Sequence, residues 1–167
     1  MKLQCRALLF SYLFAAAGFA AAAGTVSVSF VNASKYWDAG TTPWDEEANL
    51  KLLAEHFEAL GKRFLRDGEV LKIEVLDVDL AGTTRPWRRS GNEVRIVSGG
   101  ADWPRVGLRY SLAVNGTPVR SGEESVIDMN YTRGLVGTRY SEPLHHEKDM
   151  LEKWFKASFV EGRAAAN

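Results

Sequence analysis

The stretch from Thr42 to Leu80 constrains the fold more than any other part of the sequence. Thr42-Pro43 is a typical helix start, a capping hydroxyl followed by proline at the first helical position, and it predicts a helix to about Phe64. The apolar residues of this helix form one stripe at helical spacing: Leu53, Phe57, Leu60 and Phe64. A helix with a single apolar stripe must be covered by another element of the fold.

The segments on either side of this helix alternate between apolar and polar residues, as half-buried strands do. Residues 25–32 place Val26, Val28 and Phe30 on one face, and residues 69–80 place Leu71, Ile73 and Val75 on one face with Val78 on the other. Short links join strand, helix and strand. We therefore expect a crossover in which the helix covers one face of a sheet.

The remainder of the chain predicts further strands and a second helix. We expect a loop at 81–90, a short strand at 93–98, and a hairpin of residues 106–114 and 118–128 around Asn115-Gly116. Ser141 or Glu142 is expected to cap the last helix, with Pro143 at its start. Its apolar stripe is Leu144, Leu151, Trp154 and Phe155.

The element order β-α-β-β-β-β-α indicates an α+β fold. We expect a single-domain two-layer sandwich at residues 24–161, with a mostly antiparallel sheet of four to five strands and both helices on one face. Residues 162–167 are expected to form a frayed tail. No internal repeat is apparent in the sequence.

The first 23 residues have the layout of a cleavable signal peptide. Lys2 and Arg6 precede an uncharged run at 7–23 that ends in three alanines, so cleavage is expected after Ala23. An uncleaved membrane anchor is the alternative, because the run is only slightly shorter than a membrane span. The one cysteine, Cys5, precedes the apolar run and leaves with the signal, so disulfides and thiolate chemistry are excluded from the mature chain.

Charge and location restrict the partners. The whole chain has 21 basic and 21 acidic residues spread along its length, which argues against nonspecific nucleic-acid binding and against attachment to an anionic membrane surface. After signal cleavage no stable membrane span is expected. The expected partner is a protein or small-molecule ligand in the cell envelope, and no cofactor is predicted.

Asp77 and Asp79 are the most unusual polar residues of the chain. Alternation places both carboxylates on one strand face about 7 Å apart, where they can share a cation or a proton. In the other interpretation, Asp79 caps the turn at Ala81-Gly82 and Asp77 is solvated or paired with an arginine. The sequence leaves the presence of a metal undecided.

Two loops carry further candidate ligand-binding residues. Trp87 and Arg88 lie in an arginine-rich loop, and Arg109 either extends this patch or pairs with a carboxylate across the sheet. Asp128 and Tyr131 follow the hairpin, where the chain enters a glycine-rich loop that could bind a ligand. In the other interpretation, Asp128 caps a turn and Tyr131 packs against the edge of the sheet.

The familiar catalytic and metal-binding motifs are missing from the sequence. The neighbouring His145 and His146 point about 100° apart on a helix, which disfavours a shared metal ion. His56 is expected to be a packed helical histidine. No nucleophile elbow, zinc-protease helix, phosphate-binding loop or dinucleotide fingerprint is present, so no catalytic residue is predicted.

Four segments together resemble a known family. They are Lys35-Tyr36-Trp37-Asp38, Asp77-Val78-Asp79-Leu80-Ala81-Gly82, Asp128-Met129-Asn130-Tyr131, and residues 147–155 from Glu147-Lys148 to Trp154-Phe155. Their combination is similar to the bacterial exported proteins catalogued as domain of unknown function 3016. The resemblance implies a Gram-negative envelope protein, periplasmic or secreted, and implies no activity or catalytic residue.

These observations support two hypotheses about function. The first is a noncatalytic envelope protein that binds a ligand or partner through its aromatic and arginine-bearing loops. The alternative is a hydrolase or metal-assisted enzyme that uses Asp77 and Asp79, and Asp128 as a further acid.

Overall fold

A computed structural model describes residues 24–86, 93–133 and 142–161. The main sheet has four strands in the order β1-β2-β5-β6. These strands are Thr25–Phe30 (β1), Glu69–Asp79 (β2), Arg105–Val114 (β5) and Thr117–Ile127 (β6). β1 and β2 are parallel, whereas β5 is antiparallel to both of its neighbours, β2 and β6.

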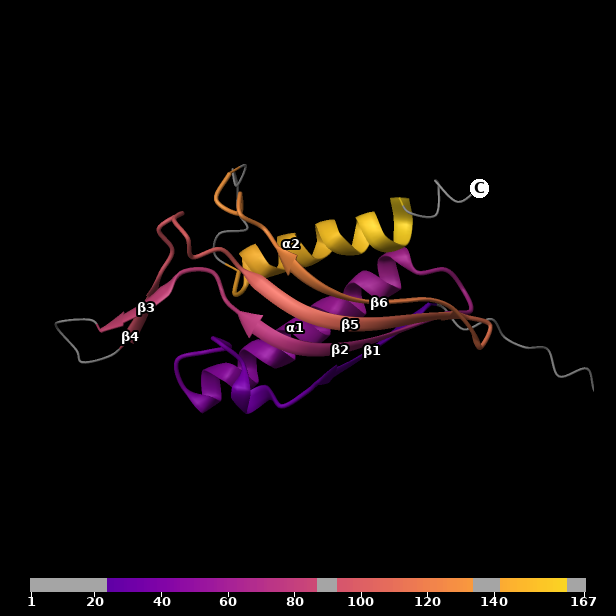
Figure 1. Cartoon of the computed structure of the whole chain (residues 1–167), viewed down its shortest axis with the longest axis horizontal. Helices are drawn as coiled ribbons and strands as arrows, with labels where there is room; N and C mark the ends of the chain where they lie inside the picture. The colour runs from indigo at the N-terminus through magenta and orange to yellow at the C-terminus, as the bar shows by residue number, and fades with distance from the viewer. Residues whose placement is uncertain (1–23, 87–92, 134–141, 162–167) are drawn as a thin grey trace, which may run out of the picture.

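Two helices pack against one face of this sheet (Figure 1). Helix α1 spans Pro43–Phe64, with the predicted cap: the Thr42 hydroxyl accepts a hydrogen bond from the Asp45 N–H. Helix α2 spans His145–Lys156 and continues into a wider helical turn, η3, at Ala157–Glu161. The parallel β1-α1-β2 unit is the predicted crossover, and the α+β sandwich is confirmed.

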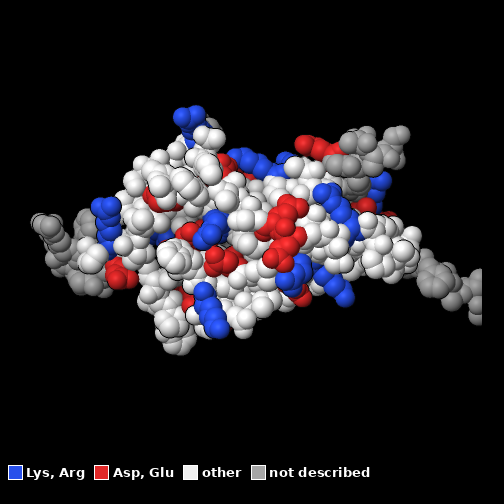
Figure 2. All heavy atoms as spheres, viewed as in Figure 1, with Lys and Arg blue, Asp and Glu red and all other residues white. Residues whose placement is uncertain are grey.

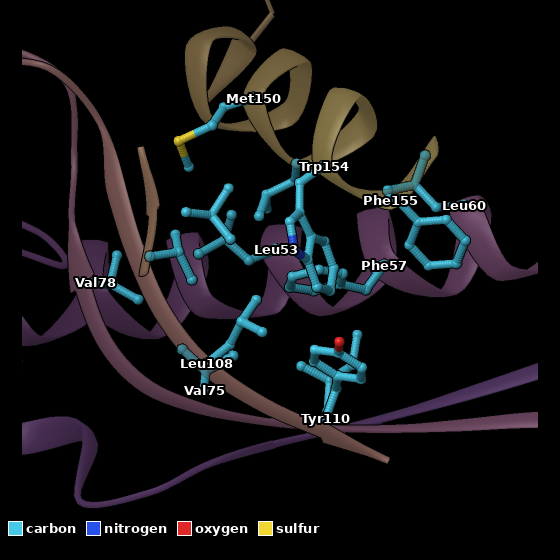
Figure 3. Packing of buried hydrophobic residues seen from close by; sticks show 14 of the residues in the cluster. Leu53, Phe57, Leu60, Val75, Val78, Leu108, Tyr110, Met150, Trp154 and Phe155 are labelled. Carbon is cyan, nitrogen blue, oxygen red and sulfur yellow. The ribbon is translucent and has the colours of Figure 1, made fainter. Parts of the chain in front are cut away.

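The core lies between the helices and the sheet. Leu53, Phe57 and Leu60 of α1 are fully buried, and so are Leu151 and Phe155 of α2. Figure 3 shows Leu53, Phe57 and Phe155 in the same cluster as Val75, Val78, Leu108 and Tyr110 of the sheet. Burying large apolar side chains in one contiguous cluster is the main favourable contribution to the stability of such a domain.

The second half of β2 departs from the predicted alternation. Val78 was expected on the face opposite Val75, yet both are fully buried in the core. The cause is a β-bulge at Leu76: Val75 pairs with Leu108 and Asp77 with Gly107, so Leu76 is an extra residue with no partner in β5. The bulge thus places Val78 on the same covered face as Val75.

The predicted loop at 81–90 contains a strand. Thr83–Pro86 (β3) pairs with Glu93–Ile96 (β4) in a separate two-stranded antiparallel sheet. This hairpin projects beyond the end of the main sheet (Figure 1). The loop prediction was wrong because β3 has no apolar face of its own to bury, whereas β4 lies within the strand expected at 93–98.

The start of the last helix was also predicted wrongly. Helix α2 begins at His145, and its N-cap is Leu144 in a left-handed conformation with φ of 57°. The Leu144 side chain is partly buried and packs against the core. Burial of an apolar side chain at this position therefore takes precedence over polar capping by Glu142, and Ser141 lies outside the described residues.

Candidate ligand-binding cleft

The bulge in β2 determines where the two candidate aspartates point. Uninterrupted alternation from Leu71 would place Asp77 and Asp79 on the covered face with the core. Because Leu76 is extra, both are instead on the open face, opposite Gly107 and Arg105 of β5. Bulges are common beside functional sites, where they redirect side chains.

Arg105 bridges the two carboxylates. Its Nη2 lies 3.3 Å from Asp77 Oδ2 and 3.5 Å from Asp79 Oδ2. Burial raises the pKa of Asp79, Arg105 opposes this shift, and the nearby charges of Asp38 and Asp77 add to it. The guanidinium group thus occupies the position that a cation shared by the two acids would need.

The segment before α1 runs alongside the end of β2. The Asp38 N–H donates to the Val78 carbonyl at 2.9 Å, and the Leu80 N–H donates to the Asp38 carbonyl at 3.0 Å. The Trp37 N–H donates to Asp77 Oδ1 at 2.9 Å. Although its backbone is held in this way, the Trp37 residue remains 78% exposed.

Asp38 also anchors the β3-β4 hairpin. Its two carboxylate oxygens accept hydrogen bonds from Nη1 and Nη2 of Arg95 in β4, at 2.9 and 2.6 Å. This is the bidentate geometry that makes arginine-carboxylate pairs strong and directional. The same guanidinium reaches the carbonyl oxygens of the connecting turn, those of Leu80, Ala81 and Gly82.

A third polar group fixes the opposite side of the cleft. The Tyr131 hydroxyl donates to Asp102 Oδ1 at 2.6 Å, and the N–H and hydroxyl of Ser98 both donate to Asp102 Oδ2. Donation by Tyr131 is the largest influence lowering the pKa of Asp102. Burial, followed by the contact with Asp102, raises the pKa of Tyr131 to about 12.

These groups surround an open cleft of about 610 Å³ between the end of the main sheet and the base of the hairpin. Its apolar lining is unusually exposed: Trp37 is 78%, Met129 64% and Ile127 40% exposed. The complete set of lining residues is Trp37, Asp38, Asp79, Gly82, Thr83, Thr84, Ala101, Asp102, Trp103, Arg105, Ile127 and Met129.

A buried glutamate connects the cleft to the helical layer. Glu147, in the first turn of α2, is only 3% exposed, and its Oε1 accepts a hydrogen bond from the Ala81 N–H at 2.7 Å. Burial raises the pKa of Glu147, and the Ala81 N–H partly opposes this shift. The contact joins two of the segments on which the family resemblance rests, Asp77–Gly82 and residues 147–155.

Of the described candidate residues, Asp79 lines the cleft, Asp77 and Tyr131 contact its lining residues, and Arg109 and Asp128 lie outside the lining. Arg109 bridges Glu74 and Glu123 on neighbouring strands at 2.9 and 2.8 Å, which is the cross-strand pairing that the sequence left open. Asp128 accepts the Asn130 N–H at 2.9 Å and pairs with Lys153 at 2.7 Å. Trp87 and Arg88 lie outside the described residues.

The histidines are packed in or beside the helical layer. The rings of His145 and His146 lie 3.7 Å apart, and His146 contacts the edge of Tyr131. His56 Nε2 is 3.0 Å from the Lys148 carbonyl. Across the described ranges, no group of three or more His, Cys, Asp or Glu side chains is placed to hold a metal ion.

Sequence reasoning missed several residues of the cleft. Trp37, Trp103 and Met129 were not among the candidates, because nothing in the sequence marks an aromatic or thioether side chain in a loop as exposed. Arg95 was missed because its partner, Asp38, is far away along the chain. Tyr36-Trp37-Asp38 is part of one segment of the family resemblance, and this resemblance could have identified Trp37 and Asp38 as candidates.

Comparison with curated proteins and with solved structures gives no match. A family model described as "Protein of unknown function (DUF3016)" matches residues 24–157 and so covers most of the chain. The match spans the whole main sheet, the hairpin and α2. The chain therefore belongs to the family of domain of unknown function 3016.

Proposed function

We propose that this chain is an exported protein of the Gram-negative envelope that binds a ligand in the cleft at the end of β2 without transforming it. One observation carries the proposal: Trp37 is 78% exposed on a backbone segment held by hydrogen bonds to β2. Exposing a large aromatic surface to water is unfavourable, and rigid aromatic side chains beside fixed polar groups are typical of binding sites.

The location is supported by the signal-like residues 1–23 and by the character of the surface. Acidic and basic side chains are interspersed over the face shown in Figure 2. Within the described ranges, no helix has both the length and the apolar composition needed to cross a membrane. These properties fit a protein that is released after its signal is removed.

The alternative is a hydrolase in which Asp79 acts as an acid, and the raised pKa of Asp79 is the observation that favours it. The contacts of the two acids weigh against this alternative. Arg105 pairs with both, and Asp77 also accepts the Trp37 N–H. Both carboxylates are thus engaged in holding the walls of the cleft.

Export is tested by the mass of the protein recovered from the periplasm. We expect a chain that starts at Gly24, and we expect an Ala23→Asp variant to remain unprocessed in the membrane fraction, because signal peptidase requires a small residue before the cut. Recovery of the full-length wild type from the cytoplasm would contradict export.

Binding is tested by a thermal-shift screen of the periplasmic form against divalent metals, peptides, metabolites and glycan fragments. Ligands that bind only the native state raise the melting temperature. We expect a hit that Trp37→Ala abolishes and that Trp44→Ala preserves, since Trp44 is 81% exposed on α1 and outside the cleft. If the protein converts one of the screened compounds into a product, and Asp79→Asn abolishes this conversion, the enzyme is favoured instead.

A further inference from the structure

We infer that the ligand of the cleft is a neutral glycan of a few sugar units. This inference rests on the proposed function and adds the chemical class of the ligand. It follows from three properties of the cleft: the exposed aromatic surface, the mixture of donors and acceptors, and the ion pairs that Asp38 and Asp79 already make.

The aromatic surface matches one face of a sugar ring. Trp37 and Trp103 both line the cleft, together with the exposed side chains of Met129 and Ile127. A pyranose presents a flat patch of C–H groups surrounded by hydroxyls, so it can cover an indole face while its hydroxyls reach polar groups at the rim. A volume of about 610 Å³ is within the range of small-molecule sites and holds more than one such ring.

The polar groups beside the aromatic surface include both donors and acceptors. Asp79 and Asp102 offer carboxylate oxygens, Arg105 offers guanidinium N–H groups, and Thr83 and Thr84 offer hydroxyls. A sugar hydroxyl both donates and accepts, so it can use such a mixture. Each carboxylate retains lone pairs beyond those used in its present contacts.

The distribution of charge argues against a charged ligand. An anion would meet the three carboxylates of the lining, those of Asp38, Asp79 and Asp102, against the single guanidinium group of Arg105. At Asp38 or Asp79 a cation would have to displace an existing partner, because Asp38 is held twice by Arg95 and Arg105 bridges Asp79 and Asp77. A neutral hydroxylated ligand adds hydrogen bonds without breaking either ion pair.

The test is isothermal titration of the periplasmic protein with neutral tetrasaccharides of glucose and of N-acetylglucosamine. A tetragalacturonate and a lysine-rich hexapeptide serve as the anionic and cationic probes. We expect saturable binding of at least one neutral tetrasaccharide, at least a tenfold loss of affinity in Trp37→Ala, and unchanged affinity in Trp44→Ala. A second variant, Trp103→Ala, is expected to weaken binding as well.

The outcomes separate this inference from the proposed function. If the peptide or the galacturonate binds in a way that depends on Trp37 and neither neutral sugar binds, the ligand is not a neutral glycan. The proposed binding cleft would then still stand. If a neutral sugar binds equally well to Trp37→Ala and to Trp103→Ala, the cleft is not its binding site. If neither neutral sugar binds to a protein that circular dichroism shows to be folded, the inference of a glycan ligand is also overturned.

Discussion

The helical layer and the cleft share the last residues of strand β2, on its covered and its open face, and they are held together in different ways. In the covered layer, Val75 and Val78 are fully buried among Phe57, Leu53 and Phe155, and packing provides the stability. In the cleft, Trp37 stays exposed and the backbone is fixed by polar contacts to Asp38 and Asp77. The difference teaches that stability and ligand binding are assigned to opposite faces of β2, because after the bulge at Leu76 the strand keeps Val78 in the core and turns Asp77 and Asp79 to the open face.

The largest expected effect is in the covered layer. Phe57→Ala removes a fully buried ring that packs edge-on against Trp154, so we expect a loss of about 3–5 kcal/mol in the free energy of unfolding. Urea denaturation followed by circular dichroism measures it. Glu58→Ala on the exposed side of the same helix is the control, with a change within about 0.5 kcal/mol. If Trp37→Ala destabilises as much as Phe57→Ala, the division between the two regions fails.

The next effect concerns the contact that joins the regions. Glu147→Ala leaves the buried Ala81 N–H without its acceptor, and we expect a loss of about 1–3 kcal/mol. Hydrogen exchange at Ala81 and Gly82 should accelerate by more than exchange at Leu108, because the turn at the cleft loses its attachment to α2. Equal acceleration at all three amides would show that Glu147 serves the core as a whole.

The same glutamate gives stability a dependence on pH. Burial raises the pKa of Glu147 above the ordinary value of 4.5. A carboxyl with a raised pKa in the folded state contributes stability that is full below the unfolded pKa and is lost as the pH rises through the folded pKa. Relative to the wild type, Glu147→Gln should therefore gain stability as the pH rises above the ordinary glutamate pKa of 4.5. Parallel stability curves for the two proteins, from urea titrations at each pH, would contradict this assignment.

The smallest effect is expected on the open face of the sheet. Arg109 pairs with Glu74 and Glu123, but the guanidinium and both carboxylates are about half exposed. Exposed ion pairs contribute little. Arg109→Ala should leave the urea midpoint and ligand affinity unchanged within error, and a clear loss of affinity would extend the binding site from the cleft onto the sheet.

The sequence could predict the covered layer because its signals are local and repeated. The bounds of α1 followed from the Thr42-Pro43 cap and the stripe through Phe57, and the hairpin of β5 and β6 followed from Asn115-Gly116. Each of these signals lies within a few residues of the element that it specifies, and apolar spacing reports burial directly.

The cleft could be predicted only in part, because it depends on contacts between distant segments. Asp77 and Asp79 were identified as candidates from the sequence. Nothing in the apolar run around Leu76 indicates that this residue forms a bulge. Val78 was therefore assigned to the wrong face of the strand. Asp38 pairs with Arg95 over 57 residues of sequence and Glu147 with Ala81 over 66, and neither contact could be predicted from the sequence alone.

The central claim is that ligand binding takes place in the cleft beside Trp37. The most direct measurement is the indole N–H spectrum of the ¹⁵N-labelled protein, which has five tryptophans, during titration with the neutral tetrasaccharide that binds in calorimetry. The account predicts that the resonances of Trp37 and Trp103, assigned with the alanine variants, shift with saturation, while those of Trp44 and the core residue Trp154 stay in place. Shifts confined to Trp44, or no shift at Trp37 at saturation, would contradict it.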